Sequence, residues 1–351
     1  MEKNIKDSIL KVDQLIDDKE YSDAFSILCD LSEQYPNEGI IPYYLGRVCL
    51  NVNEEHLALQ YFLASMKRNY KSSDLFLMTG ILLSDEGEEL AAEESLINAE
   101  KSSKSDEERW VALSSLAVLY IEYERYLKAQ RIIKQLIREY PNNYQGYHLY
   151  IVEKVATEQF DEANAFILQI PQLFSNHPQF LLDYIELLQV QNKDDELNSL
   201  LNTDSRFAEI IPQEVLRARL NIIAEKDSYD KKKDIIIELA KKFNDCDAII
   251  SMMIIAFAEG DFVKSSKIAA LILEKEKDTQ GIRFYLALYF QIFNFYFLSN
   301  KRPSEQLSIW IHKAGNWCVS YADSFDSDEI GETIRVSIQE LFDEINTNNT
   351  D

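Results

Sequence analysis

The sequence predicts an all-α protein built from repeated helical hairpins, and three observations indicate that fold class. Alanines recur at intervals of 34, 34, 37 and 34 residues, at Ala24, Ala58, Ala92, Ala129 and Ala163. A large apolar residue stands four positions after each alanine, at Leu28, Phe62, Leu96, Ile133 and Ile167. The 351 residues include only nine Gly and seven Pro, fewer than a fold with many tight β-turns would need.

Each unit is expected to contain two helices joined by a short turn. In the second unit, apolar residues recur at three- and four-residue spacing on both sides of the polar stretch 51–55. Two antiparallel helices that cross closely need a small side chain at their contact. Ala58 supplies one on the second helix, and Gly46, or Gly80 in the next unit, gives similar clearance on the first helix. Pro141 follows a second helix and cannot continue it, because proline has no backbone N–H.

This pattern resembles the tetratricopeptide repeat (TPR), a 34-residue helix–turn–helix unit. Besides the residues above, the resemblance rests on Tyr21, Leu31, Pro36, Leu45, Ala99, Tyr120, Tyr126 and Phe160. The Trp that the family carries near the start of each unit is missing, so the second helix carries most of the resemblance. The resemblance implies a right-handed superhelical solenoid of about eight or nine hairpins with a C-terminal capping helix, whose first helices line a concave groove for peptides.

The resemblance is strongest in the N-terminal half of the chain. We expect repeats 1–5 over residues 5–177, a divergent helical hairpin over 178–212, and degenerate repeats over 213–323. An amphipathic pattern predicts a helix over 328–345, which would cover the apolar end of the repeat array. Residues 346–351 are expected to form a disordered tail.

Composition disfavours several classes of function. The net charge is −24, from 36 Lys+Arg against 60 Asp+Glu, whereas nucleic acids and anionic membranes attract basic surfaces. The four histidines and four cysteines show no metal-ligand spacing, and no phosphate-binding or nucleophile motif occurs. We therefore expect no enzyme, no cofactor, no metal and no catalytic residue. Scattered cysteines and the lack of a signal-peptide pattern favour a reducing, cytoplasmic location.

An aromatic segment over residues 284–297 has the most unusual composition in the chain. The surrounding uncharged stretch, Phe284 to Leu298, is too short to span a bilayer and contains Gln291 and Asn294. We interpret it as a core helix of the last repeat. The alternative is an exposed apolar stripe that mediates homodimerisation or docks a partner.

The repeat register places eleven residues in the expected groove: Tyr43, Arg47, Asn51, Leu77, Ile81, Ser114, Val118, His148, Val152, Arg217 and Asn221. Some members of the TPR family bind C-terminal peptides through a carboxylate clamp, which begins with a basic residue followed four positions later by Asn. Arg217 and Asn221 fit that pair, whereas Ser251 replaces the next Asn and Arg283 fits the final Arg only with a shifted register. The alternative is that Arg217 and Asn221 simply solvate the groove.

The resemblance therefore implies a non-catalytic scaffold or adaptor that binds a peptide or helix of another protein. The alternative is an intracellular sensor that binds a small signalling peptide and regulates a partner protein. The register predicts an apolar site with one fixed cation, formed by Tyr43, Arg47, Leu77 and Ile81. We expect a mixed or basic ligand whose single carboxylate meets Arg47.

Overall fold

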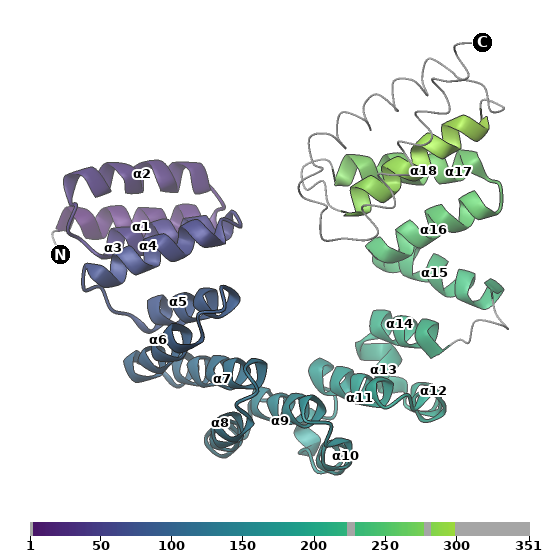
Figure 1. Cartoon of the computed structure of the whole chain (residues 1–351), viewed down its shortest axis with the longest axis horizontal. Coiled ribbons are helices and arrows are strands. Elements are labelled where there is room, and N and C mark those ends of the chain that lie inside the picture. Colours follow the sequence, from purple (N-terminus) through teal and green to yellow (C-terminus); the bar gives the residue numbers. More distant parts are fainter. Residues whose placement is uncertain (1–2, 223–228, 277–281, 299–351) are drawn as a thin grey trace. The chain divides into compact units, whose positions relative to one another are not determined.

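The computed structural model describes residues 3–222, 229–276 and 282–298, and within them the predicted all-α fold is confirmed (Figure 1). The described residues form 18 α-helices and one short 3-10 helix, and no strand occurs among them. The chain divides into two compact units, Met1–Lys193 and Asp194–Asp351. The expected capping helix over 328–345 and the expected tail over 346–351 lie outside the described residues.

The first unit contains eleven α-helices. They are α1 (Lys3–Asp17), α2 (Tyr21–Gln34), α3 (Ile40–Asn51), α4 (Glu55–Lys67), α5 (Ser73–Asp85), α6 (Glu89–Ser102), α7 (Asp106–Glu122), α8 (Tyr126–Glu139), α9 (Gln145–Ala156), α10 (Phe160–Ile167) and, after the 3-10 helix Gln172–Phe174, α11 (Pro178–Val190). Consecutive helices pack against each other as hairpins, and α5, α7, α9 and α11 also contact one another in sequence. These first helices of successive hairpins therefore form one continuous layer.

The second unit contains seven α-helices within the described residues. They are α12 (Asp194–Thr203), α13 (Ser205–Ile210), α14 (Pro212–Ile222), α15 (Tyr229–Phe243), α16 (Cys246–Ala258), α17 (Phe262–Lys275) and α18 (Ile282–Leu298). The aromatic segment forms α18, which packs on α16 and α17 and buries Phe284, Leu288 and Ile292. Asn294 is fully buried in the same contact and donates a hydrogen bond to Ser265 Oγ at 2.9 Å.

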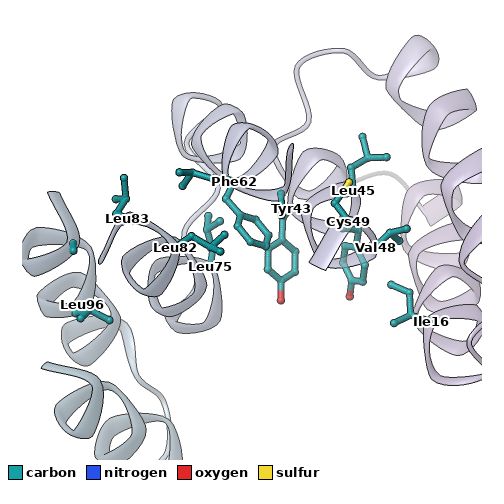
Figure 2. Packing of buried hydrophobic residues seen from close by; sticks show 14 of the residues in the cluster. Ile16, Tyr43, Leu45, Val48, Cys49, Phe62, Leu75, Leu82, Leu83 and Leu96 are labelled. Atoms are coloured by element: carbon teal, nitrogen blue, oxygen red, sulfur yellow. The ribbon is translucent and has the colours of Figure 1, made fainter. Parts of the chain in front are cut away.

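The contact between the two helices of a hairpin is as tight as the sequence spacing suggests. All five repeated alanines are fully buried, and so are Phe62 and Leu96. A Cβ atom added to Gly46 would lie 2.4 Å from the Phe62 ring, and one added to Gly80 would lie 2.7 Å from the Leu96 side chain. Figure 2 shows Phe62 and Leu96 among the buried residues of this region. In the second and third hairpins, the apolar residue four positions after the alanine thus fills the space that the glycine leaves open.

A second repeated feature is a residue with positive φ in the turn of each hairpin. It stands five positions before each repeated alanine, at Lys19, Asn53, Gly87, Glu124 and Glu158, with φ from 55° to 79°. Other connections share the conformation, at Asn69, Asn192, Asn244 and Gly260. Because Lys and Glu rarely adopt this left-handed conformation, the closely packed hairpin, rather than local preference, holds them there.

No described helix combines the length and the hydropathy needed to span a bilayer.

We predict that Ala92→Leu destabilises the first unit by about 1–3 kcal/mol, because added methylenes overpack a closed helix crossing. The neighbouring Ala91 lies on the exposed face of the same helix, so Ala91→Leu should change stability by less than about 0.5 kcal/mol. Urea unfolding of both variants measures the difference. Equal midpoints for the two variants would contradict this packing.

Candidate functional site

The expected groove residues lie on the first helices of their hairpins. Tyr43, Arg47 and Asn51 belong to α3, Leu77 and Ile81 to α5, Ser114 and Val118 to α7, His148 and Val152 to α9, and Arg217 and Asn221 to α14. The structure brings three of them, Ile81, Ser114 and Val118, to the lining of one hollow. The others lie elsewhere, and most of the polar ones have partners within the chain.

The hollow between α5 and α7 encloses about 430 Å³. We call it the α5–α7 hollow. Its lining residues are Ile81, Ser84, Asp85, Leu96, Trp110, Val111, Ser114, Ser115, Val118, Leu119, Glu122 and Gln145. Ile81 and Val118 are 40% and 38% exposed, whereas Leu96 and Leu119 are buried beneath. The hollow therefore has an apolar base and two apolar side chains open to a ligand.

Trp110 is the largest of the lining residues that the predicted groove register did not include. It precedes Ser114 by four positions, and Ser114 precedes Val118 by four, so all three lie on one stripe of α7. Extending the predicted groove stripe of α7 by one helical turn toward its N-terminus would have found it.

The lining also contains polar side chains, which are Ser84, Asp85, Ser114, Ser115, Glu122 and Gln145. Ser114 is buried, and its Oγ has no hydrogen-bond partner within the described part of the chain. A buried hydroxyl without a partner is costly.

Trp110 also lines a second hollow, of about 490 Å³, at the start of α7. We call it the acidic hollow, and its lining residues are Asp106, Glu107, Trp110, Glu139, Tyr140, Pro141, Asn142 and Asn143. Glu139 forms ion pairs with Arg109 at 2.9 Å and Arg138 at 3.0 Å. Because Trp110 belongs to both linings, the two hollows adjoin.

Tyr43 and Arg47 have partners on neighbouring first helices. Tyr43 is buried, and its hydroxyl donates to Asp74 at the start of α5. Arg47 Nη1 lies 2.7 Å from Asp13 Oδ1 on α1, with its guanidinium 5.0 Å from the centre of the Tyr44 ring. The carboxylate that was expected to come from a ligand is therefore supplied to Arg47 by Asp13.

The other α3 and α5 positions are also occupied by contacts within the chain. Asn51 donates from Nδ2 to the Arg47 carbonyl at 2.9 Å, and Leu77 packs against the main apolar cluster.

Arg217, the basic residue compared with the clamp, is likewise paired. Arg217 Nη2 lies 2.7 Å from Oδ2 of the buried Asp245, which also accepts a hydrogen bond from Gln213. Arg283 pairs with Asp247 at 3.1 Å, and Ser251 Oγ donates to the Asp247 carbonyl. Asn221 is exposed. These contacts leave no free pair of cations for a peptide carboxylate among the residues compared with the clamp.

His148 joins α9 to α11 through a buried carboxylate. Its Nδ1 lies 2.9 Å from Asp183 Oδ1, and Asp183 also accepts hydrogen bonds from Tyr144 at 2.7 Å and Gln179 at 2.9 Å. Burial disfavours the charged imidazolium, but the hydrogen bond and negative charge of Asp183 outweigh that effect and raise the pKa of His148. Val152, one turn later on α9, is half-buried.

The raised pKa predicts a pH-dependent stability. A group whose pKa is higher in the folded state contributes its full stabilisation below its unfolded pKa, about 6.5 for His, and loses it as the pH rises through the folded value. Unfolding of the first unit should therefore require less urea at pH 8 than at pH 6. His148→Gln should remove part of that difference. An identical pH dependence in the wild type and the variant would show that this pair does not couple folding to protonation.

Comparisons with known proteins identify the fold. No protein-family model and no curated protein matches the sequence. A TPR protein from Parabacteroides merdae ATCC 43184 superposes with a TM-score of 0.52 and 13% identity, over 83% of this chain and 98% of that chain. The C-terminal part of a TPR protein from Cytophaga hutchinsonii gives a TM-score of 0.45 and 14% identity, over 78% and 99%.

A third match is a chain in the structure of Naa15/Naa10 bound to HypK-THB, with a TM-score of 0.37 and 14% identity over 88% of this chain. The present chain spans 57% of the length of that chain. The solved structures that resemble most of this chain include TPR proteins, and the fold is a helical repeat of the tetratricopeptide type.

Proposed function

We propose that this protein is a non-catalytic interaction scaffold that binds a peptide or helical segment of a partner protein in the α5–α7 hollow. The TPR fold is typical of protein-interaction scaffolds. The observation that carries the proposal is the open apolar surface that Ile81, Trp110 and Val118 form on two adjacent first helices.

The composition of the hollow suits a side chain of a polypeptide. Exposed apolar surface that lines a concavity marks interaction sites, and Trp is among the residues that contribute most to protein interfaces. Ile81 and Val118 come from different helices and leave a channel between them, with Leu96 and Leu119 below. A bulky apolar side chain of a ligand would replace water there with contacts on several sides.

No group of three or more His, Cys, Asp or Glu side chains in the described ranges has an arrangement suited to a metal.

The test is a selection of short random peptides displayed on phage against the full chain. Peptides that bind the wild type should bind Ile81→Gln/Val118→Gln at least about fivefold more weakly, which corresponds to roughly 1 kcal/mol. These changes remove apolar surface from the hollow without altering the net charge.

The matched control is Leu90→Gln/Leu127→Gln, which changes two leucines that are 72% and 76% exposed and line neither hollow. The control should bind as the wild type does. A selection that yields no peptide sensitive to the Ile81 and Val118 changes would refute the proposed site.

A further inference from the structure

We propose that the segment bound in the α5–α7 hollow is basic, with a bulky apolar side chain between Ile81 and Val118 and a Lys or Arg side chain near Asp85 and Glu122. This inference rests on the proposed function and adds the chemical class of the ligand. It follows from the distribution of charge around the two adjoining hollows.

Every charged residue that lines either hollow is acidic. The lining residues include Asp85 and Glu122 in the α5–α7 hollow, and Asp106, Glu107 and Glu139 in the acidic hollow. Neither lining includes a Lys or an Arg. The two nearest basic residues in sequence to this lining, Arg109 and Arg138, are both paired with Glu139.

Several of these carboxylates have no cation of their own. Within the ranges that the structure describes, Asp85, Asp106 and Glu107 form no ion pair, and Glu122 accepts only a 3.3 Å hydrogen bond from Ser84. A ligand cation near Asp85 and Glu122 would therefore meet carboxylates that no cation of the described chain neutralises.

Helix stability explains only part of this arrangement. Asp106 and Glu107 lie in the first turn of α7, where negative charge is favourable to the helix dipole. Asp85 and Glu122 are the last residues of α5 and α7, where negative charge is unfavourable to the dipole. These two carboxylates weaken the helices that carry them, so a role in binding accounts for them better.

The unpaired acids lie next to the apolar walls of the α5–α7 hollow. Asp85 stands one helical turn after Ile81 on α5, and Glu122 stands one turn after Val118 on α7. A cation that follows the apolar anchor of a ligand by a few residues would therefore reach these two carboxylates. The net charge of −24 would also speed the approach of a basic segment.

The test uses the selected peptides whose binding depends on Ile81 and Val118. They should be enriched in Lys or Arg within a few residues of a bulky apolar residue. One such synthetic peptide, titrated calorimetrically against the full chain, should bind Asp85→Asn/Glu122→Gln about three- to tenfold more weakly. These variants should fold at least as well as the wild type, because the changes remove unfavourable charges from helix C-termini.

The matched control is Glu54→Gln/Glu55→Gln, which removes two exposed carboxylates at the start of α4 that line neither hollow. It should leave the affinity unchanged. Raising the salt from about 50 to 500 mM should weaken binding to the wild type more than binding to Asp85→Asn/Glu122→Gln.

The outcomes separate the two proposals. Neutral or acidic peptides that depend on Ile81 and Val118, or equal binding by both charge variants, would overturn the basic-ligand inference and leave the proposed function standing. If no peptide depends on Ile81 and Val118, the proposed function fails as well. Light scattering provides a further check. If the wild type is a dimer and Ile81→Gln/Val118→Gln is a monomer, a second copy of the chain occupies the hollow and the inference is overturned.

Discussion

The close crossing of the two helices in each hairpin is the constraint on which the rest of the first unit depends. The side chains of Ala58 and Ala92 are fully buried at the crossing, so a larger side chain would not fit there. The glycine on the facing helix has no room for a Cβ atom. The short turn that permits this crossing requires a residue with positive φ five positions earlier. With the hairpin fixed in this way, successive first helices come into contact, and that contact creates the surface available for binding.

The layer of first helices uses the same two repeat positions in different ways. In the second hairpin these positions hold Tyr43 and Arg47, which bind Asp74 and Asp13 on the neighbouring first helices. In the fifth hairpin His148 binds Asp183 of the next first helix. The third and fourth hairpins instead place Ile81 and Val118 at these positions. No polar link between repeats occupies those sites, and there the hollow opens.

The repeat unit could be predicted from sequence because its signals are local or strictly periodic. The interval between Ala58 and Ala92, with a large apolar residue four positions after each, reflects a packing pattern that the first five hairpins share. The turn conformation at Lys19 or Glu124 could not be predicted in this way, since neither residue type favours positive φ and tertiary packing imposes it.

The site was predictable only in part. The groove register placed Ile81, Ser114 and Val118 on one surface, but the partners of Arg47 and Tyr43 lie 34 and 31 residues away along the chain. Whether a groove residue is free or paired depends on how one hairpin stacks on the next. The repeat pattern in the sequence does not show that stacking. The sequence does not show that Asp13 lies beside Arg47, and this contact already gives Arg47 the carboxylate that was expected from a ligand.

Polar contacts between α6 and α7 hold one wall of the α5–α7 hollow in place. They affect how tightly the hollow can bind a ligand. Glu93 of α6 accepts a hydrogen bond from Tyr120 of α7 at 2.7 Å and pairs with Arg125 at 2.9 Å. Arg109 of α7 pairs with Glu100 of α6 at 2.9 Å. These links fix α7, which carries Trp110, Ser114 and Val118, against its neighbour before any ligand arrives. A surface ordered in advance loses less conformational entropy on binding, so a short segment with one apolar anchor and one cation has enough contacts to be recognised.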